Sequence, residues 1–236
     1  MKKALLWCFI GLMSTPAIAQ NNAQMTPTLY TELQEYLNAR AKELDQIPDE
    51  RKADLRELAT FIQEEQAAGK VPQLTFICTH NSRRSHMAQL WMAAAMAYAN
   101  AGKVATYSGG TEVTAFNPRA VKALRDAGFK IESDAAKSNP NYAVRWSDVL
   151  DESNCFSKHY AHESNPQKGF GAVMTCSQAD EACPIVFGAA ARFAIAYEDP
   201  KLADDTPQEA MRYTERCQQI AREMLFVAKA VREAGN

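Results

Sequence analysis

Short apolar, β-prone runs that alternate with helical segments constrain the fold of this chain most. The runs have the length of buried parallel strands and fall at residues 74–77, 104–107, 171–175 and 193–197. One helix is predicted between the first two runs, over residues 85–101, and another runs from Asn117 to near Gly128. Parallel strands need such crossovers, which place helices on the faces of the sheet. The alternation therefore predicts an α/β fold around a mainly parallel sheet, with ligands at the carboxyl ends of its strands.

The sequence signals for the remaining elements range from weak, in residues 131–170, to clear, in the last helix. Gly109 and Gly110 are expected to end the second strand, and the polar residues 131–170 give only weak strand signals, at residues 142–146 and 155–160. The last helix is the clearest element, because Thr206-Pro207-Gln208-Glu209 combines a capping-box pattern with proline at the first helical position. Its apolar stripe comprises Tyr213, Cys217, Ile220, Met224, Val227 and Val231. Because this stripe should face the core, Cys217 is predicted to be buried in the core rather than to act as a reactive thiol.

The N-terminus has the pattern of a secretory signal. Met1-Lys2-Lys3 is basic, residues 4–13 are apolar, and Ala17-Ile18-Ala19 offers small residues at a cleavage site. The apolar run is too short to span a bilayer comfortably, which argues against a lasting membrane anchor. We therefore expect residues 1–19 to be a signal peptide and the mature protein to be exported, to the periplasm.

Residues 20–71 are predicted to form a polar tether followed by a two-helix extension. Thr26 can cap the first helix with Pro27 at its first position, and the second helix begins at Asp49. Both helices have an apolar face that would pack against a main domain formed by residues 72–236.

Charge and cysteine content exclude some partners. The chain has 26 basic and 28 acidic residues, and loss of Lys2 and Lys3 leaves 24 against 28, a net charge near −4. No basic surplus is left for nucleic acid or acidic lipid.

Five cysteines follow the signal: Cys78, Cys155, Cys176, Cys183 and Cys217. An odd number means that at least one thiol stays unpaired, pairs transiently or pairs with another molecule.

The loop after the first predicted strand carries the main chemical signal. Cys78 ends that strand and a helix begins near Ser85, so backbone N–H groups and the positive helix end point at one spot. Arg84 can clamp a tetrahedral oxyanion, and Arg83 adds positive potential. The same field favours the thiolate of Cys78, to which Ser85 can donate, and Asn81 suits a left-handed backbone. We predict an oxyanion site with Cys78 as its nucleophile.

Residues 74–88 resemble the phosphate-binding loop of the low-molecular-weight protein tyrosine phosphatase superfamily, which includes thioredoxin-coupled arsenate reductases. Four positions match that motif: Cys78, Asn81, Arg84 and Ser85. The resemblance covers most of residues 72–236 and implies a three-layer fold with a mainly parallel four-stranded sheet. It assigns substrate binding to Thr79, His80, Asn81, Ser82, Arg83, Arg84 and Ser85. His80 replaces a usual glycine and Arg83 a frequent cysteine, and either change can alter the pocket's size or anion preference.

The resemblance also assigns the proton donor, which is an aspartate directly before a proline. Asp199 fits this position, with Glu198 as the fallback acid. Tyrosine phosphatases of this family usually place aromatic residues after that aspartate to hold the substrate ring. Pro200, Lys201 and Leu202 stand there instead, which disfavours phosphotyrosine.

Cys176 and Cys183 lie seven positions apart and leave two alternatives open. No histidine accompanies them at ligand spacing, so no metal is expected, and no cofactor is expected either. A structural disulfide is one alternative for an exported protein. Resemblance to arsenate reductases implies the other: Cys176 attacks an arsenylated Cys78, and Cys183 then forms a disulfide with Cys176. A thioredoxin-like partner would reduce that disulfide.

Three functions follow from these residues. The favoured one is an exported thiol-dependent arsenate reductase that uses the Cys78 nucleophile and the Cys176/Cys183 relay. The alternative is a phosphomonoesterase of the tyrosine phosphatase type, in which Asp199 and water hydrolyse a Cys78 phosphoenzyme. The third is a non-catalytic oxyanion-binding or thiol-exchange protein. Cys155 is not assigned a role: it is expected to be a small buried residue, with a third partner in thiol exchange as the alternative.

Overall fold

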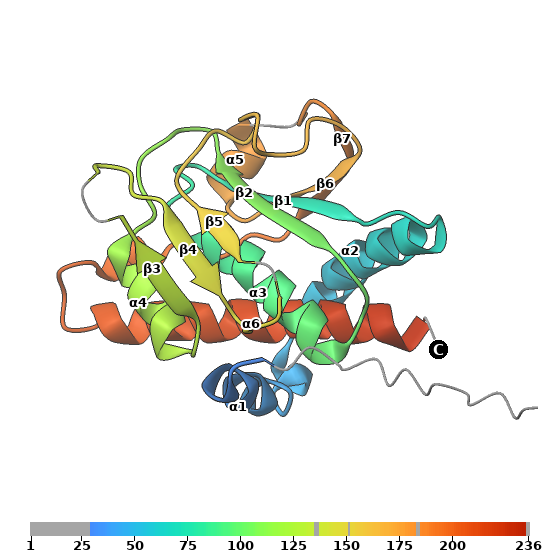
Figure 1. The fold of residues 1–236 in the computed structure, drawn as a ribbon, viewed down its shortest axis with the longest axis horizontal. Helices are drawn as coiled ribbons and strands as arrows, with labels where there is room; N and C mark the ends of the chain where they lie inside the picture. Colours follow the sequence, from blue (N-terminus) through green and yellow to red (C-terminus); the bar gives the residue numbers. More distant parts are fainter. Residues whose placement is uncertain (1–28, 135–136, 151, 183–184, 235–236) are drawn as a thin grey trace, which may run out of the picture.

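A computed structural model describes residues 29–134, 137–150, 152–182 and 185–234. Its centre is a sheet of four parallel strands: β2 (Ala105–Gly110), β1 (Gln73–Cys78), β6 (Phe170–Met174) and β7 (Ala189–Ala194), in that spatial order (Figure 1). Each neighbouring pair runs in the same direction. The predicted α/β class with a parallel four-stranded sheet is confirmed.

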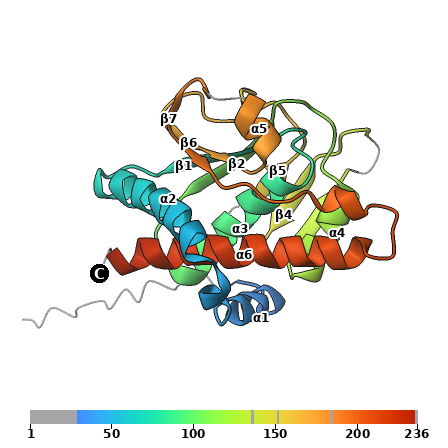
Figure 2. The same cartoon turned by 180° about the vertical axis from the view of Figure 1, so that it is seen from behind.

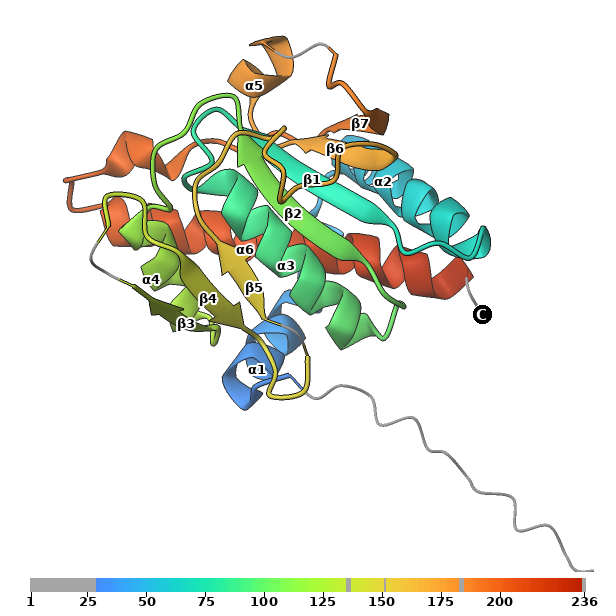
Figure 3. The same cartoon turned by 45° about the horizontal axis from the view of Figure 1, so that its top comes forward.

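Helices cover one face of this sheet around a large hydrophobic core. α3 (Arg84–Ala99), α6 (Glu209–Ala234) and α2 (Asp49–Ala67) pack there, together with Leu74 and Phe76 of β1. A smaller core on the other face contains Ile77 and Met174, and the short helix α5 (Ser177–Ala182) lies over it (Figure 3). Because successive side chains of β1 point to opposite faces of the sheet, this strand contributes to both hydrophobic cores.

The last helix behaves largely as its pattern predicts. All six residues of its apolar stripe are buried: Tyr213, Cys217, Ile220, Met224, Val227 and Val231. Its start differs in detail, because α6 begins at Glu209 and Thr206 Oγ1 accepts from the N–H of Gln208 at 3.3 Å rather than from that of Glu209. Glu209 instead accepts from the backbone N–H of Asp205 and pairs with Arg119, while the Thr206 hydroxyl donates to the carbonyl of Ala203.

The N-terminal helices are α1 (Thr31–Arg40) and α2, joined by a short 3-10 turn, η1 (Leu44–Gln46), and they pack beside α6 (Figure 2). α2 begins at Asp49 as predicted. α1 begins later than expected, because the Tyr30 N–H donates to the carbonyl of Trp146 and holds the chain extended before Thr31. Thr26, Pro27 and the predicted signal lie outside the described residues. The proposed division at residue 71 stays a prediction, since these helices share the main core.

A second, antiparallel sheet occupies the polar stretch that was hard to interpret. Its strands are β3 (Lys130–Ser133), β4 (Tyr142–Arg145) and β5 (Ser153–Cys155), and α4 (Pro118–Asp126) precedes it with Asn117 as its cap. The strand expected over residues 155–160 is wrong beyond Cys155. The backbone there runs beside β2 instead, where Gly110 donates to Lys158 and accepts from Tyr160.

The ends of two strands of the central sheet can be compared with the predicted ones. β2 ends at Gly110, so Gly109 and Gly110 close this strand as predicted, and a Cβ on Gly110 would come within 2.5 Å of the Glu112 carbonyl and 2.7 Å of the Asn81 nitrogen. Glycine is needed there for close backbone approach. β7 ends at Ala194, although Ile195 and Tyr197 still donate to the end of β6 and its following residue. Among the described residues, no helix is long and apolar enough to cross a membrane.

Candidate active site

The Cys78 loop, defined as residues 79–83, joins the carboxyl end of β1 to the first turn of α3. Within the described part of the chain, none of its five backbone N–H groups donates a hydrogen bond to a backbone carbonyl. Asn81 has φ +44°, the left-handed conformation that was predicted for it. Consecutive backbone N–H groups beside a helix start form an anion-binding concavity. The geometry of the loop therefore allows it to hold an oxyanion next to Cys78.

Asn81 and Ser85 hold this loop and reach the nucleophile. The Asn81 side chain donates to Ser85 Oγ at 2.9 Å and accepts from the backbone N–H of Lys158 at 2.9 Å. Ser85 Oγ lies 3.2 Å from Cys78 Sγ. Because Ser85 Oγ already accepts from Asn81, its own hydrogen is available to donate to the sulfur. The side chains of Asn81 and Ser85 thus position the loop, and Ser85 places a hydroxyl donor at the Cys78 sulfur.

Arg84 connects the loop to the predicted proton donor. Its Nη1 donates to the Tyr197 carbonyl at 3.1 Å and its Nη2 to Asp199 Oδ2 at 2.7 Å. Arg84 Nε is buried and has no hydrogen-bond partner among the described residues. Asp199 also caps the short 3-10 helix η2 (Pro200–Ala203), accepting from the Lys201 N–H through Oδ1 at 3.1 Å. The structure therefore brings the predicted clamp and the predicted acid into contact.

Arg83 is directed towards α6. Its Nε donates to the Tyr213 hydroxyl at 2.7 Å and its Nη2 to Asp204 Oδ2 at 3.2 Å, with Asp199 Oδ1 at 4.0 Å from Nε. Burial raises the pKa of Tyr213 to about 12, so this hydroxyl stays protonated and donates to Asp204 Oδ1 at 2.8 Å. Arg83 therefore ties the loop to the segment that carries Asp199, in addition to raising the local potential.

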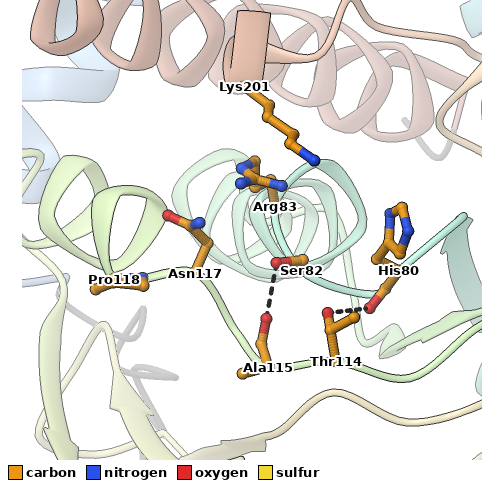
Figure 4. A pocket seen from close by; sticks show the side chains of 8 residues that line it. All are labelled: His80, Ser82, Arg83, Thr114, Ala115, Asn117, Pro118 and Lys201. Atoms are coloured by element: carbon orange, nitrogen blue, oxygen red, sulfur yellow. Dashed lines mark hydrogen bonds between the residues drawn. The ribbon is translucent and has the colours of Figure 1, made fainter. Parts of the chain in front are cut away.

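Thr79, His80 and Ser82 complete the predicted loop. The His80 ring is partly exposed and pairs with Glu112 at 3.2 Å, while Ser82 Oγ donates to the Ala115 carbonyl at 2.7 Å. Both residues line a cleft of about 310 Å³ beside the loop (Figure 4). Thr79 instead faces the smaller core, where its hydroxyl lies 3.5 Å from the sulfur of Cys176.

Cys176 lies against the loop although 98 positions separate it from Cys78. β1 and β6 are neighbours, and the Thr175 N–H donates to the Ile77 carbonyl at 2.7 Å, which puts Cys176 beside Thr79. Cys176 is buried, and its sulfur also accepts from the Ala179 N–H at 3.3 Å. Cys183 lies outside the described residues. The four described thiols, Cys78, Cys155, Cys176 and Cys217, are all free.

The two remaining described thiols are part of the hydrophobic core. Cys217 accepts from Trp91 Nε1 at 3.3 Å, and burial raises its pKa to about 11. Burial raises the pKa of Cys155 to about 12. Both side chains are buried, as was expected for each. They remain neutral thiols at neutral pH and stand apart from the chemistry of the loop.

Several residues that support the site were missed by the sequence reasoning. Asp204 and the Tyr213 hydroxyl hold Arg83, and Ser157 Oγ donates to the His80 carbonyl at 2.9 Å. Arg51 of α2 pairs with the buried Glu223 and donates to the Ala196 carbonyl at 3.0 Å, just before Asp199. No local spacing signals these contacts, because each joins segments at least 77 positions apart.

Comparison with known proteins now assigns the chain to a family. Residues 73–150 match the family model for low molecular weight phosphotyrosine protein phosphatase. An arsenate reductase of Bacillus subtilis is 30% identical over 141 residues, which are 60% of this chain and 83% of that protein. Arsenate reductase 2 of Staphylococcus epidermidis is 29% identical over 125 residues, 53% of this chain and 76% of that protein. The chain therefore belongs to the low-molecular-weight protein tyrosine phosphatase superfamily, which is a family of enzymes.

A solved relative is more distant. The low molecular weight protein tyrosine phosphatase from T. tengcongensis is 18% identical, with 65% of this chain and 95% of that chain covered and a TM-score of 0.44.

Proposed function

We propose that this protein is a thiol-dependent arsenate reductase in which Cys78 attacks arsenate. The observation that carries the proposal is a second free thiol, Cys176, packed against the Cys78 loop with its sulfur 3.5 Å from Thr79 Oγ1. A phosphatase needs no such thiol, whereas thiol exchange does. The matched arsenate reductases support the same choice.

The first step forms a bond between Cys78 Sγ and the arsenic of arsenate. An As–O bond breaks, and Asp199 supplies a proton so that the oxygen leaves as water. The free backbone N–H groups of the loop and the buried Nε of Arg84 would neutralise the remaining oxygens. Asp199 contacts Arg84 Nη2, so the acid lies beside the oxyanion site.

The second step reduces arsenic. The Cys176 thiolate attacks Cys78 Sγ, a disulfide forms, and the electron pair of the As–S bond stays on arsenic, which leaves as arsenite. Cys183 then attacks Cys176, which releases the Cys78 thiolate and leaves a Cys176–Cys183 disulfide. A thioredoxin-like dithiol restores both thiols and is itself oxidised. Cys176 must leave its contacts with Thr79 and Ala179 during these steps.

We also propose that the protein is exported to the periplasm, on the strength of the signal pattern in residues 1–19. That compartment is kept oxidising, so a dedicated reductant would have to be delivered there. Fractionation of cells that express the full chain tests this. A periplasmic product starting at Gln20 would support export, and a cytoplasmic product that retains Met1 would contradict it.

A phosphomonoesterase is the second candidate, and one observation favours it. The cleft beside the loop, about 310 Å³, leaves room for a leaving group much larger than a single oxygen. In this function Cys78 takes the phosphoryl group, Asp199 protonates the leaving oxygen, and water hydrolyses the phosphoenzyme.

One set of assays separates the two functions. Reduced protein is measured against arsenate with thioredoxin, thioredoxin reductase and NADPH, and against p-nitrophenyl phosphate. We expect arsenate turnover that Cys176→Ser reduces to at most one turnover per chain, while Cys217→Ala, the matched buried thiol, still turns over. Cys78→Ser should abolish both activities. Full arsenate turnover by Cys176→Ser would disprove the relay, and hydrolysis of the phosphate ester alone would establish the phosphatase.

A further inference from the structure

The cleft beside the Cys78 loop has an unusual charge. Two cations, Arg83 and Lys201, line it together with the polar residues His80, Ser82, Thr114 and Asn117. The lining contains neither a carboxylate nor a Phe, Tyr or Trp ring. Figure 4 shows the Lys201 ammonium and the Arg83 guanidinium on the same side of this space. Two like charges that face one cleft are destabilising until an anion lies between them.

Neighbouring carboxylates neutralise these cations only in part. Asp204 and Asp199 lie beside Arg83; Asp199 also pairs with Arg84, and Asp204 with Arg119, which in turn pairs with Asp205 and Glu209. Glu112 pairs with His80 and is largely exposed. No ion pair joins Lys201 to any carboxylate of the described residues. The Lys201 ammonium is therefore the charge at the cleft that no ion pair among the described residues neutralises.

Hydrogen-bond donors also remain available at the cleft. The Asn117 side chain accepts from the Arg119 N–H through Oδ1, which leaves its NH₂ group without a partner among the described residues. Arg83 uses Nε and Nη2 for Tyr213 and Asp204, and its Nη1 makes no bond within the same part of the chain. Charged and neutral donors that converge on a cleft without Phe, Tyr or Trp rings suit a carboxylate or phosphate group.

We propose that this cleft is a subsite for a second anionic group, carried by the same small molecule whose oxyanion occupies the Cys78 loop. This inference rests on the proposed oxyanion site and specifies its ligands further. The favoured organic ligands are short, non-aromatic molecules with a phosphoryl group at one end and a carboxylate or second phosphate at the other. Lys201, next to Pro200 on the helix that Asp199 caps, is the residue that selects them.

Ligand protection of Cys78 tests the subsite without any need for turnover. The reduced full chain is alkylated with iodoacetamide, and modification of the Cys78 peptide is followed by mass spectrometry. Inorganic phosphate reports on the loop alone. Two matched pairs report on the cleft: phosphonoacetate against ethylphosphonate, and 3-phosphonopropionate against propylphosphonate. For at least one pair, we expect the carboxylate compound to protect at about tenfold lower concentration.

Lysine variants show whether the preference for the carboxylate compounds arises at the cleft or from a general attraction of anions to the protein. Lys201→Met should reduce the preference to about twofold or less, and Lys201→Arg should restore it. Lys103→Met, which removes an exposed lysine before the opposite end of β2, should leave the preference at the wild-type value. Equal protection by both members of each pair, or a preference that survives in Lys201→Met, would overturn the subsite. If inorganic phosphate still protects in that case, the oxyanion loop stands; if no compound protects, both fail.

Discussion

The two segments that carry the first two thiols of the proposed relay lie side by side, yet they are held very differently. In the Cys78 loop and the first turn of α3, five consecutive residues from Asn81 to Ser85 are buried. Their side chains bond to other segments, including Tyr213 of α6 and the Asp199 region. Among the described residues that follow β6, the six-residue helix α5 is the first element, and Ile185 and Phe187 beyond it are 69% and 82% exposed.

This difference matches the two chemical tasks. An oxyanion site works through donors that are already aimed before the ligand arrives, so the loop must be rigid. A relay thiol must approach one sulfur and then another, so its segment must be free to move. The sulfur of Cys176 is buried, and within the described part of the chain its hydrogen-bonding contacts are to the Thr79 hydroxyl and the Ala179 N–H.

Arg84→Lys tests the rigidly held Cys78 loop, and we expect it to have the largest effect of the changes considered. Lysine cannot contact the Tyr197 carbonyl, Asp199 and a bound oxyanion together. We expect kcat/KM for arsenate or phosphate ester to fall by about 10²- to 10³-fold. Circular dichroism should show an intact fold. A loss of less than threefold would mean that the clamp lies elsewhere.

Asp199→Asn should have the next largest effect. Asparagine keeps the size of the side chain but removes the proton donor, so turnover of an alkyl phosphate or arsenate should fall by about 10²-fold. The control is Asp205→Asn, an exposed carboxylate on the same segment whose left-handed backbone tolerates asparagine. Equal losses in the two variants would point to a general change in charge rather than to an acid.

A matched pair of stability measurements compares the two segments directly. Asn81→Ala removes two hydrogen bonds and places alanine at φ +44°, so we expect a loss of about 2 kcal/mol in the free energy of unfolding. Phe187→Ala removes a larger side chain that is mostly exposed, and the change should stay within about 0.5 kcal/mol. Urea unfolding of both variants measures this, and a larger loss for Phe187→Ala would contradict the contrast.

The smallest expected effect is on the pH dependence of stability, and it comes from Cys155, a buried thiol that belongs to neither segment. Burial raises the pKa of Cys155 to about 12, from about 9 in the unfolded chain. A raised pKa gives stability that is complete below pH 9 and is lost as the pH rises towards 12, because the unfolded thiol ionises first. Between pH 8 and pH 10 this thiol should account for about 1 kcal/mol of lost stability. Urea unfolding of Cys155→Val should show a pH dependence that is smaller by that amount, and an unchanged dependence would contradict it.

The sequence by itself determined the local parts of this protein. The strand, loop and helix around Cys78, the left-handed Asn81, the parallel strands and the buried stripe of α6 all follow from patterns within a few residues. Such patterns reflect backbone geometry and side-chain periodicity, which act over neighbouring positions. The sequence also placed Arg84 in the oxyanion loop, because its position relative to a strand end and helix start is local.

Only the tertiary structure decided what the long side chains contact. Arg83 reaches Tyr213 across 130 positions, Cys176 lies beside Thr79 across 97, and Arg51 supports the backbone before Asp199 from an N-terminal helix. The start of α1 and the end of β5 were also set by distant partners, Trp146 and Gly110. Such contacts depend on how sheets and helices pack, and no local spacing encodes them.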